Sequence, residues 1–294
     1  MAKESVWSVA KGSVRSVANN SGNRRANLTR VTMTVENNGR ERKSAVIVAH
    51  PGHELMIYHW IERHRPLYCC LTDGSGGRAV SRVASTTRLL EGAGAVRGPI
   101  CGRYSDKQIY RLLLDKQVHA FVGLMSELAE ALSAAGVECV AGDATEGFNP
   151  VHDVCRILID GAVAMVRRQT RRQLRNYEFV LDSAPGGAAA SPTDGAEVLR
   201  LDGAALERKI AAALGYPEMR AEVEAAVARF GRQAFAVEVL KPAGVTSPGA
   251  RFEHEPPTYE RHGQMRVNEG LYSEIITYGD HVRPVLRAVE DAAR

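Results

Sequence analysis

The sequence predicts an α/β protein with three layers, in which a mainly parallel sheet is covered by helices on both faces. From residue 43 to about residue 160, apolar runs of strand length alternate with amphipathic stretches of helix length. Glycine, proline and aspartate follow the apolar runs, at points where the chain has to turn. Such alternation is typical of buried parallel strands joined by crossover helices.

The first predicted unit is a strand, a turn and a helix. Residues 44–50 (SAVIVAH) are a continuous apolar run that ends at a Pro-Gly pair, and residues 53–64 (HELMIYHWIERH) are amphipathic. The unit then repeats. Residues 66–72 (PLYCCLT) predict a second buried strand, and residues 81–96 (SRVASTTRLLEGAGAV) predict a helix that ends near a glycine before a third apolar stretch.

Further elements follow the same pattern. We expect two helices in residues 106–136, a strand in 137–143 (VECVAGD), a helix in 152–168, a strand in 177–182 (YEFVLD), a loop in 183–195, helices in about 204–230, a strand in 235–242 and a last helix from about Asp280. The loop in 183–195 is long and rich in small residues and proline, so we expect it to cover a site.

The composition limits the domain organisation and the location. Residues 1–42 are polar and lack sustained periodicity, so we expect a mobile N-terminal extension, although the run 28–36 (LTRVTMTVE) is also compatible with an edge strand. Residues 43–294 are expected to form one domain. No stretch approaches the roughly 18 apolar residues of a membrane span. The five cysteines suggest no paired framework, which favours a cytoplasmic protein.

The charge distribution argues against a nucleic-acid partner. The 294 residues carry a formal charge of +4, but the arginines are scattered among glutamates instead of forming one basic stripe. We therefore expect a small-molecule partner and neither nucleic acid nor membrane. The sequence leaves a homo-oligomer open.

Three histidines stand at the ends of predicted elements. His50 ends the first strand, His53 opens the next helix, and His152 opens the helix after the loop ATEGFNPV. Ligands bind beyond the carboxyl ends of strands in open parallel sheets, and three protein ligands with one open position are typical of catalytic zinc. The spacing indicates a Zn²⁺ site, with Fe²⁺ or another divalent transition metal as the alternative. The competing interpretation makes His53 a helix-start residue that donates to backbone and His152 a solvent-facing cap.

Three segments resemble, in the same order, the LmbE-like (PIG-L-type) N-deacetylases. VIVAHPGHE resembles the AHPDDE signature, LTDGSGG resembles LTDGEGG, and EGFNPVHD resembles the HPDH segment, with NPVH in its place. The resemblance continues through the helix that carries Arg88 and Glu91 and, more weakly, to about residue 290. It implies a Rossmann-like α/β fold and a zinc enzyme that removes acetyl groups from amino sugars and related small molecules.

The resemblance also implies roles for single residues. His50 and His152 match two metal ligands of the family, and His53 stands where the family has its aspartate ligand, which implies a three-histidine site. Arg88 would bind a substrate hydroxyl, carboxylate or phosphate. The C-terminal third would contribute elements of the substrate cleft.

Two departures from the family pattern concern proton transfer. Gly52 stands in place of the general base, and Asn149 stands in place of a histidine that stabilises the oxyanion; an amide can donate a hydrogen bond but cannot deliver a proton. Glu54 and Asp73 are the nearest carboxylates in sequence and resemble residues that orient ligands. Acid-base help is worth roughly 10²–10⁴ in rate, so hydrolysis without it should be slow. A structural explanation of Gly52 is a tight turn with positive φ.

These observations favour a metal-dependent hydrolase of the N-deacetylase type that acts on a small sugar-like or natural-product amide. Two alternatives remain. A metalloenzyme of the same fold would catalyse lyase, transfer or redox chemistry, and a pseudo-deacetylase would bind without catalysis.

Overall fold

The computed structural model describes residues 43–76, 80–182, 185, 194–244, 252 and 255–294. The N-terminal extension expected in residues 1–42, with its alternative edge strand, lies outside the described residues. Most of the loop expected in residues 183–195 also lies outside them.

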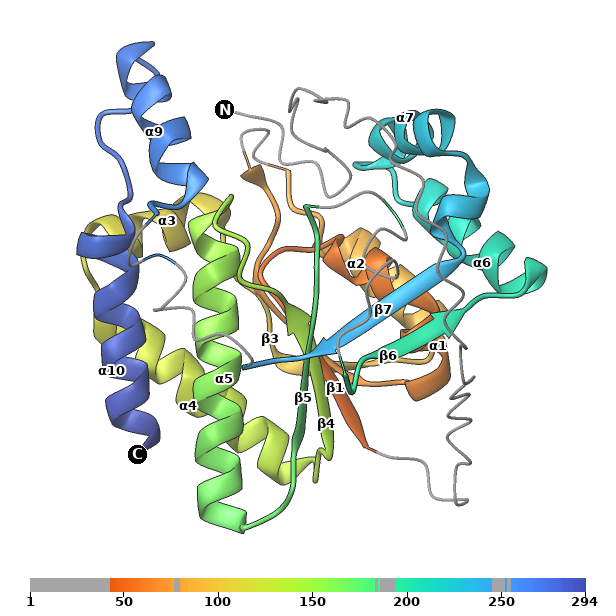
Figure 1. Ribbon diagram of the computed structural model, residues 1–294, viewed down its shortest axis with the longest axis horizontal. Coiled ribbons are helices and arrows are strands. Elements are labelled where there is room, and N and C mark those ends of the chain that lie inside the picture. Colours follow the sequence, from red (N-terminus) through yellow and green to blue (C-terminus); the bar gives the residue numbers. More distant parts are fainter. Residues whose placement is uncertain (1–42, 77–79, 183–184, 186–193, 245–251, 253–254) are drawn as a thin grey trace, which may run out of the picture.

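A seven-stranded sheet forms the middle layer (Figure 1). Its strands, in spatial order, are β3 (Val96–Tyr104), β2 (Leu67–Thr72), β1 (Ser44–Val48), β4 (Cys139–Asp143), β5 (Arg175–Phe179), β7 (Val237–Pro242) and β6 (Glu197–Arg200). The first five strands are parallel, whereas β7 pairs antiparallel with both β5 and β6. The predicted Rossmann-like three-layer sandwich with a mainly parallel sheet is confirmed.

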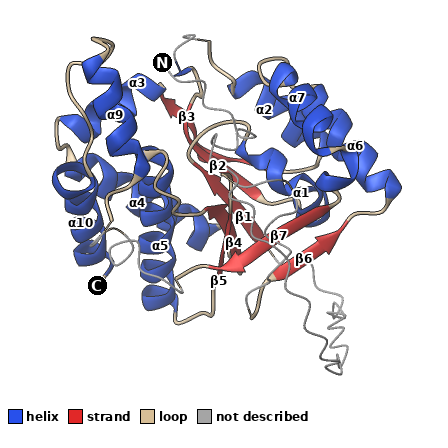
Figure 2. Cartoon of the chain, turned by 45° about the horizontal axis from the view of Figure 1, so that its top comes forward, coloured by secondary structure: helices blue, strands red, loops and turns tan. Residues whose placement is uncertain are grey.

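Helices cover both faces of the sheet (Figure 2). One face carries the 3₁₀ helix η1 (His53–Ile57) with α1 (Tyr58–His64), α2 (Val83–Gly92), α6 (Gly203–Leu214), α7 (Arg220–Phe230) and the 3₁₀ helix η4 (Arg232–Phe235). The other face carries α3 (Asp106–Leu114), α4 (Val118–Ala134), α5 (Pro150–Thr170), the π-helical turn η5 (Tyr278–Val282) and α10 (Arg283–Ala293). Each face buries its own hydrophobic cluster against the sheet.

The position of β1 in the sheet explains why its sequence is apolar after Ser44. Val46 and Val48 contribute to the cluster under α1 and α6, whereas Ala45 and Ile47 contribute to the cluster under α4 and α5. Successive side chains of a strand point to opposite faces, and both faces here are covered. A continuous apolar run is therefore what this central position requires.

The start of α5 is fixed by its sequence. The Asn149 side chain accepts a hydrogen bond from the backbone N–H of Val151 at 2.8 Å, and Pro150 occupies the first helical position. Asparagine at the N-cap and proline just after it both favour a helix start. This start places His152 in the first turn of α5, beside the carboxyl ends of β1 and β4.

Besides the short 3₁₀ helix η4, two described elements have no counterpart among the expected ones. Strand β6 has four residues at the edge of the sheet, and helix α9 (Thr258–Asn268) buries only Tyr259 and Gly263. A short edge strand and a mostly exposed helix both lack the apolar periodicity on which a sequence pattern depends. The helix expected from His53 is also divided, because its first turn is 3₁₀.

A buried ion pair ties the C-terminal half to α1. Lys209 Nζ of α6 donates to Glu238 Oε1 of β7 and to the carbonyl oxygen of Met56, both at 2.8 Å. The Glu238 carboxylate also accepts from the backbone N–H groups of His59 and Trp60. Both charged side chains are almost completely buried. Paired charges with satisfied hydrogen bonds are the form in which burial of charge is tolerated.

We expect Lys209→Met to lower the free energy of unfolding by about 3–5 kcal/mol, because it leaves the buried Glu238 charge without its partner. Urea unfolding followed by circular dichroism measures the change. Arg208→Met is the matched control, because Arg208 lies beside Lys209 on α6 but makes a partly exposed ion pair with Glu62 of α1. The stability of Arg208→Met should stay near that of the wild type. Equal effects of the two substitutions would contradict this assignment.

No helix in the described part of the chain is both long and apolar enough to cross a membrane.

Candidate metal centre

The fold brings the three predicted histidines together. His50 follows β1, His53 opens η1, and His152 lies in the first turn of α5. The ring centroids of His50 and His53 are 5.4 Å apart, those of His50 and His152 5.0 Å, and those of His53 and His152 4.5 Å. All three side chains are buried. A cluster of three buried imidazoles therefore stands at the carboxyl ends of β1 and β4.

His50 is held by a carboxylate. Its Nδ1 lies 3.0 Å from Asp106 Oδ1 and 2.8 Å from Thr72 Oγ1, and Asp106 Oδ2 accepts from the Gly76 backbone N–H. Burial of Asp106 is the largest single influence and raises its pKa, but the hydrogen bond and charge interaction with His50, together with hydrogen bonds from Thr72 and Gly76, outweigh burial and hold the pKa of Asp106 well below its usual range. Because an ionised carboxylate only accepts, Nδ1 carries a proton, and Nε2 is the ring nitrogen that a metal could use.

His53 has the same type of support. Its Nδ1 lies 3.0 Å from both carboxylate oxygens of Asp143, the last residue of β4. Asp143 is fully buried, and its Oδ2 also accepts from the backbone N–H of Ala49 at 2.7 Å. The His53 ring therefore donates to a side chain and not to the backbone, unlike in the competing interpretation.

His152 differs from the other two histidines. Both of its ring nitrogens are buried and have no hydrogen-bond partner among the described residues, and the Phe148 ring packs perpendicular to it at 4.8 Å between centroids. Burial, with His53 and His50 close by, lowers the pKa of His152 well below its usual range, so the ring is neutral. Its burial excludes a solvent-facing cap. A neutral imidazole whose nitrogens have no hydrogen-bond partner among the described residues has the donor atoms that a metal ligand needs.

The three histidines fit a metal ion in chemistry and spacing. Imidazoles that share a zinc ion at about 2.0–2.1 Å have ring centroids about 5 Å apart, which is close to the observed separations. Metal-bound histidines usually donate their other ring N–H to a carboxylate, as His50 and His53 do here. Among the described residues, no three His, Cys, Asp or Glu side chains already meet at a common metal position. Binding therefore requires the ring nitrogens to turn toward one point.

Asn149 lies next to this cluster, at the N-cap of α5. Its Oδ1 accepts from Val151 N and from the Tyr110 hydroxyl, which lies 3.2 Å away. The predicted oxyanion role uses the other end of the amide, the Nδ2 donor. That role stays a prediction.

Glu54 is buried beside the Pro-Gly turn. Its carboxylate accepts from the Gly52 backbone N–H at 2.8 Å, from the Tyr68 hydroxyl at 3.0 Å and from the Thr86 hydroxyl at 2.7 Å. Burial raises the pKa of Glu54, and these hydrogen bonds only partly offset it. The contacts support the turn between His50 and His53, which is compatible with the expected orienting role.

The described hydrogen bonds of Asp73 and Arg88 go to residues outside the cluster. Asp73 Oδ1 accepts from the Ser75 backbone N–H in the turn after β2, and Arg88 on α2 is exposed, with one guanidinium nitrogen 3.2 Å from Ser85 Oγ. Among the described hydrogen bonds, neither side chain bonds to one of the three histidines. Their predicted roles, orientation for Asp73 and substrate binding for Arg88, stay predictions.

Two carboxylates that contact the cluster, Asp106 and Asp143, are absent from the residues singled out in the sequence. A signal for Asp143 exists, because it ends the apolar run VECVAGD just as His50 ends SAVIVAH. Asp106 follows β3 at the start of α3, so it also lies at a carboxyl end of the sheet. The rule that selected Asp73 after the second strand applies equally to the third and fourth strands.

Gly52 has two structural reasons to be glycine. Its φ is 109°, an angle that residues with a side chain rarely adopt. A Cβ at this position would also lie 2.3 Å from Met219 Sδ. The structural explanation of Gly52 as a turn with positive φ is confirmed. Met219 fills the space that a side chain at position 52 would take.

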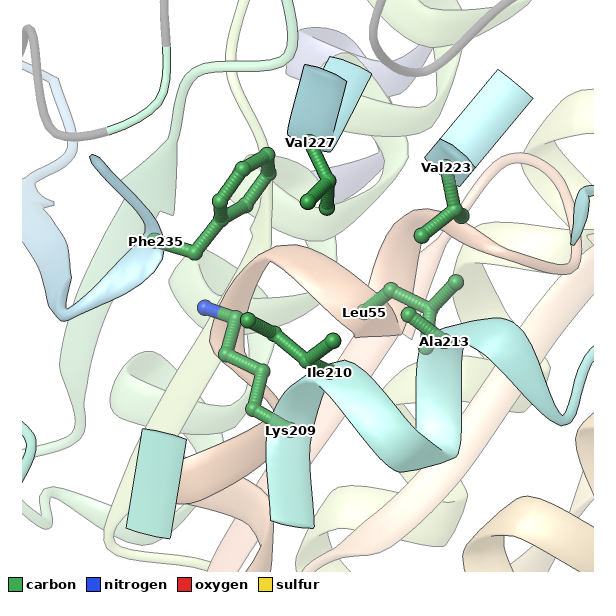
Figure 3. Close-up of a pocket in the computed structure, with 7 residues that line it drawn as sticks. All are labelled: Leu55, Lys209, Ile210, Ala213, Val223, Val227 and Phe235. Carbon is green, nitrogen blue, oxygen red and sulfur yellow. The ribbon is translucent and has the colours of Figure 1, made fainter. Parts of the chain in front are cut away.

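A small cavity lies near η1, between α6 and α7 (Figure 3). It has a volume of about 10 Å³ and is lined by Leu55, Lys209, Ile210, Ala213, Val223, Val227 and Phe235. Its size is at most that of one water molecule, so it is a packing gap and not a substrate site.

Comparisons with known proteins give similarity to solved structures alone. No family model and no curated protein matches the sequence. The fold is similar to that of the pseudoaglycone deacetylase for the antimicrobial A40926, with 17% identity over 69% of this chain and 97% of the other (TM-score 0.46). It is also similar to a conserved protein from Thermus thermophilus, with 18% identity over 68% and 93% (TM-score 0.47). A zinc-inhibited form of teicoplanin deacetylase shares 12% identity over 69% and 100% (TM-score 0.42).

We expect Asp106→Asn to weaken Zn²⁺ binding roughly 10- to 100-fold, because the amide no longer fixes the proton on His50 Nδ1. Competition with a chromogenic chelator measures the dissociation constant. Asp115→Asn, on an exposed carboxylate just after α3, serves as the control and should leave the affinity unchanged. Equal affinities of wild type and Asp106→Asn would refute the supporting role.

Proposed function

We propose that this protein is a metal-dependent amide hydrolase of the deacetylase type, acting on a small sugar-like or natural-product amide. One observation carries the proposal: His50 and His53 each turn Nδ1 to a buried carboxylate, and a third imidazole, His152, lies beside them with neither nitrogen hydrogen-bonded to any residue that the structure describes. Such a set of donors is suited to Zn²⁺, with Fe²⁺ or another divalent metal as the alternative.

The residues of the chain have separate tasks in this proposal. A bound divalent metal would polarise the amide carbonyl and lower the pKa of a water molecule. His50, His53 and His152 hold the ion, while Asp106 and Asp143 fix the orientation and the protonated nitrogen of two of these rings.

Asn149 would stabilise negative charge on the substrate. Its Oδ1 is engaged by Val151 N and Tyr110, which fixes the plane of the amide and the direction of Nδ2. A donor that is oriented in advance by the protein stabilises an oxyanion without reorganisation during the reaction. We assign this role to Asn149 as part of the proposal.

The substrate class rests on the resemblance of AHPGHE, LTDGSGG and NPVH to the N-deacetylase motifs. That resemblance favours an acylated amine on a sugar or a related small molecule. Arg88, which is exposed on α2, would contact a polar group of the substrate.

The proposal is tested with purified full-length protein that has been stripped of metal and then reloaded with Zn²⁺ or, without oxygen, with Fe²⁺. A panel of N-acylated amino sugars and N-acylated natural products is incubated with it, and mass spectrometry detects the released acid and amine. We expect release that depends on the metal and stops on addition of a chelator. Absence of release from the whole panel, with every metal and at high protein concentration, would count against the proposal.

The packing of Met219 against Gly52 favours a second candidate, a metalloenzyme with lyase, transfer or redox chemistry. No side chain at position 52 is available to accept a proton, so a reaction that needs no base at this position is compatible with the site. Metal analysis of protein purified without added metal tests the redox branch of this candidate, because stoichiometric zinc disfavours redox chemistry.

A further inference from the structure

Met219 contacts the turn that joins two of the histidines. Pro51 and Gly52 connect His50 to His53, and the position of a Cβ on Gly52 lies 2.3 Å from Met219 Sδ and 3.3 Å from its Cε. Met219 is itself buried at the N-cap of α7, far along the chain from this turn. The thioether therefore takes the place of a side chain that the turn lacks.

A chain of hydrogen bonds holds the segment Tyr216–Met219 in this place. Gly52 N donates to Glu54, Glu54 accepts from the Thr86 hydroxyl, and the Tyr216 hydroxyl lies 2.8 Å from Thr86 Oγ1. Met219 N then donates to the Tyr216 carbonyl at 3.1 Å. The chain starts at Gly52 and returns to it through the Met219 side chain. All of its members are buried.

The 3₁₀ helix η1, which follows the Pro51–Gly52 turn, also packs against α6 and α7. Leu55, two residues after His53, points among Ile210, Ala213 and Val223 (Figure 3). The 3₁₀ helix η1, which carries His53, therefore packs through Leu55 against α6 and α7. Met219 packs against the turn that leads into this helix. Glycine has more backbone conformational freedom than any other residue, so this turn needs such contacts to hold one conformation.

We infer that Met219 is a positioning residue for His50 and His53, acting through the Pro51–Gly52 turn. The inference rests on the proposed metal site. Interiors are closely packed, and the surroundings of a deleted side chain relax only partly into the space left behind. Removal of the thioether should therefore let the turn move and separate the two imidazoles from the arrangement that one ion requires.

The test compares Met219→Ala with Met125→Ala in the full-length protein. Met125 is a matched control, because it is also fully buried but lies on α4, in the hydrophobic cluster of the opposite face. Both substitutions should lower the melting temperature. Titration of metal-free protein with Co²⁺, followed by visible absorption, should show affinity reduced roughly tenfold or more in Met219→Ala alone, as for loss of other supporting contacts. Met219→Leu retains the volume and should recover most of the affinity.

A second measurement needs no metal. The ¹⁵N chemical shifts of the imidazoles report their tautomers and hydrogen bonds, and those of His50 and His53 should change in Met219→Ala and stay constant in Met125→Ala. If the wild type binds no Co²⁺, the proposed metal site fails and the imidazole shifts still decide the inference. Wild-type Co²⁺ affinity in Met219→Ala, equal losses in both variants, or unchanged shifts would overturn it.

Discussion

The His152→Ala variant is expected to lose metal-dependent amide hydrolysis completely and to bind Zn²⁺ more than about 100-fold more weakly than the wild type. Removal of a metal ligand should weaken metal binding by more than the roughly 10- to 100-fold that follows removal of a residue hydrogen-bonded to a ligand. The two remaining imidazoles, His50 and His53, would leave the ion with too few protein ligands for a tight site. Chelator competition and the acyl-release assay measure the two effects.

The stability of the metal-free variant separates loss of a ligand from loss of the fold. The imidazole of His152 is buried without a hydrogen-bond partner among the described residues, which is a cost to the metal-free protein, and loss of this cost should partly offset the cavity that His152→Ala leaves. Added Zn²⁺ should raise the melting temperature of the wild type but not that of His152→Ala. His119→Ala, on an exposed histidine of α4, is the control and should behave as the wild type. Retention of zinc stabilisation in His152→Ala would refute its assignment as a ligand.

The double variant Gly52→Asp/Met219→Ala is expected to hydrolyse amides faster than the matched variant Gly52→Asn/Met219→Ala, by roughly 10²–10⁴. Removal of the thioether makes room for a side chain at position 52, and the aspartate places a proton acceptor on the turn between His50 and His53. The asparagine has the same shape but does not accept a proton from water at neutral pH. Initial rates at saturating metal measure the ratio.

The single substitution Gly52→Asp shows whether steric exclusion is the reason for the missing base. It combines a side chain at φ 109° with a Cβ 2.3 Å from Met219 Sδ, so we expect a loss of about 1–3 kcal/mol or more in stability. Met219→Ala should recover the steric part but not the part due to φ. If Gly52→Asp were as stable as the wild type, packing would not explain the glycine. Equal rates of the aspartate and asparagine double variants would show that the chemistry needs no base at this position.

The sequence predicts the central strands because their surroundings are simple. Ser44–Val48 and Leu67–Thr72 are covered on both faces, so an uninterrupted apolar run suffices to identify them. The antiparallel pairing of β7 with β5 and β6 depends on contacts between segments far apart in sequence, and β6 is only four residues long. No local pattern contains that information.

The same distinction applies to the site. The three histidines are visible in the sequence because each stands where a predicted strand or loop meets a helix. Their partners are not, because Asp106 is 56 residues from His50, and Asp143 is 90 residues from His53. Sequence order indicates Glu54 and Asp73 as nearest carboxylates, whereas the sheet places β4 directly beside β1 and so brings Asp143 to His53. Adjacency in the sheet, and not along the chain, decides which carboxylates contact the imidazoles.

The buried pair of Lys209 and Glu238 has a consequence for how this sequence can change over evolutionary time. Loss of either side chain alone leaves a buried charge uncompensated, so a lineage that replaces one of them passes through a strongly destabilised intermediate. Single replacements at these positions should be rare among homologues, and joint replacement by two apolar residues of similar volume should be the exchange that survives. An alignment of close relatives would then show positions 209 and 238 varying together, while positions 208 and 62, whose ion pair is partly open to solvent, vary independently.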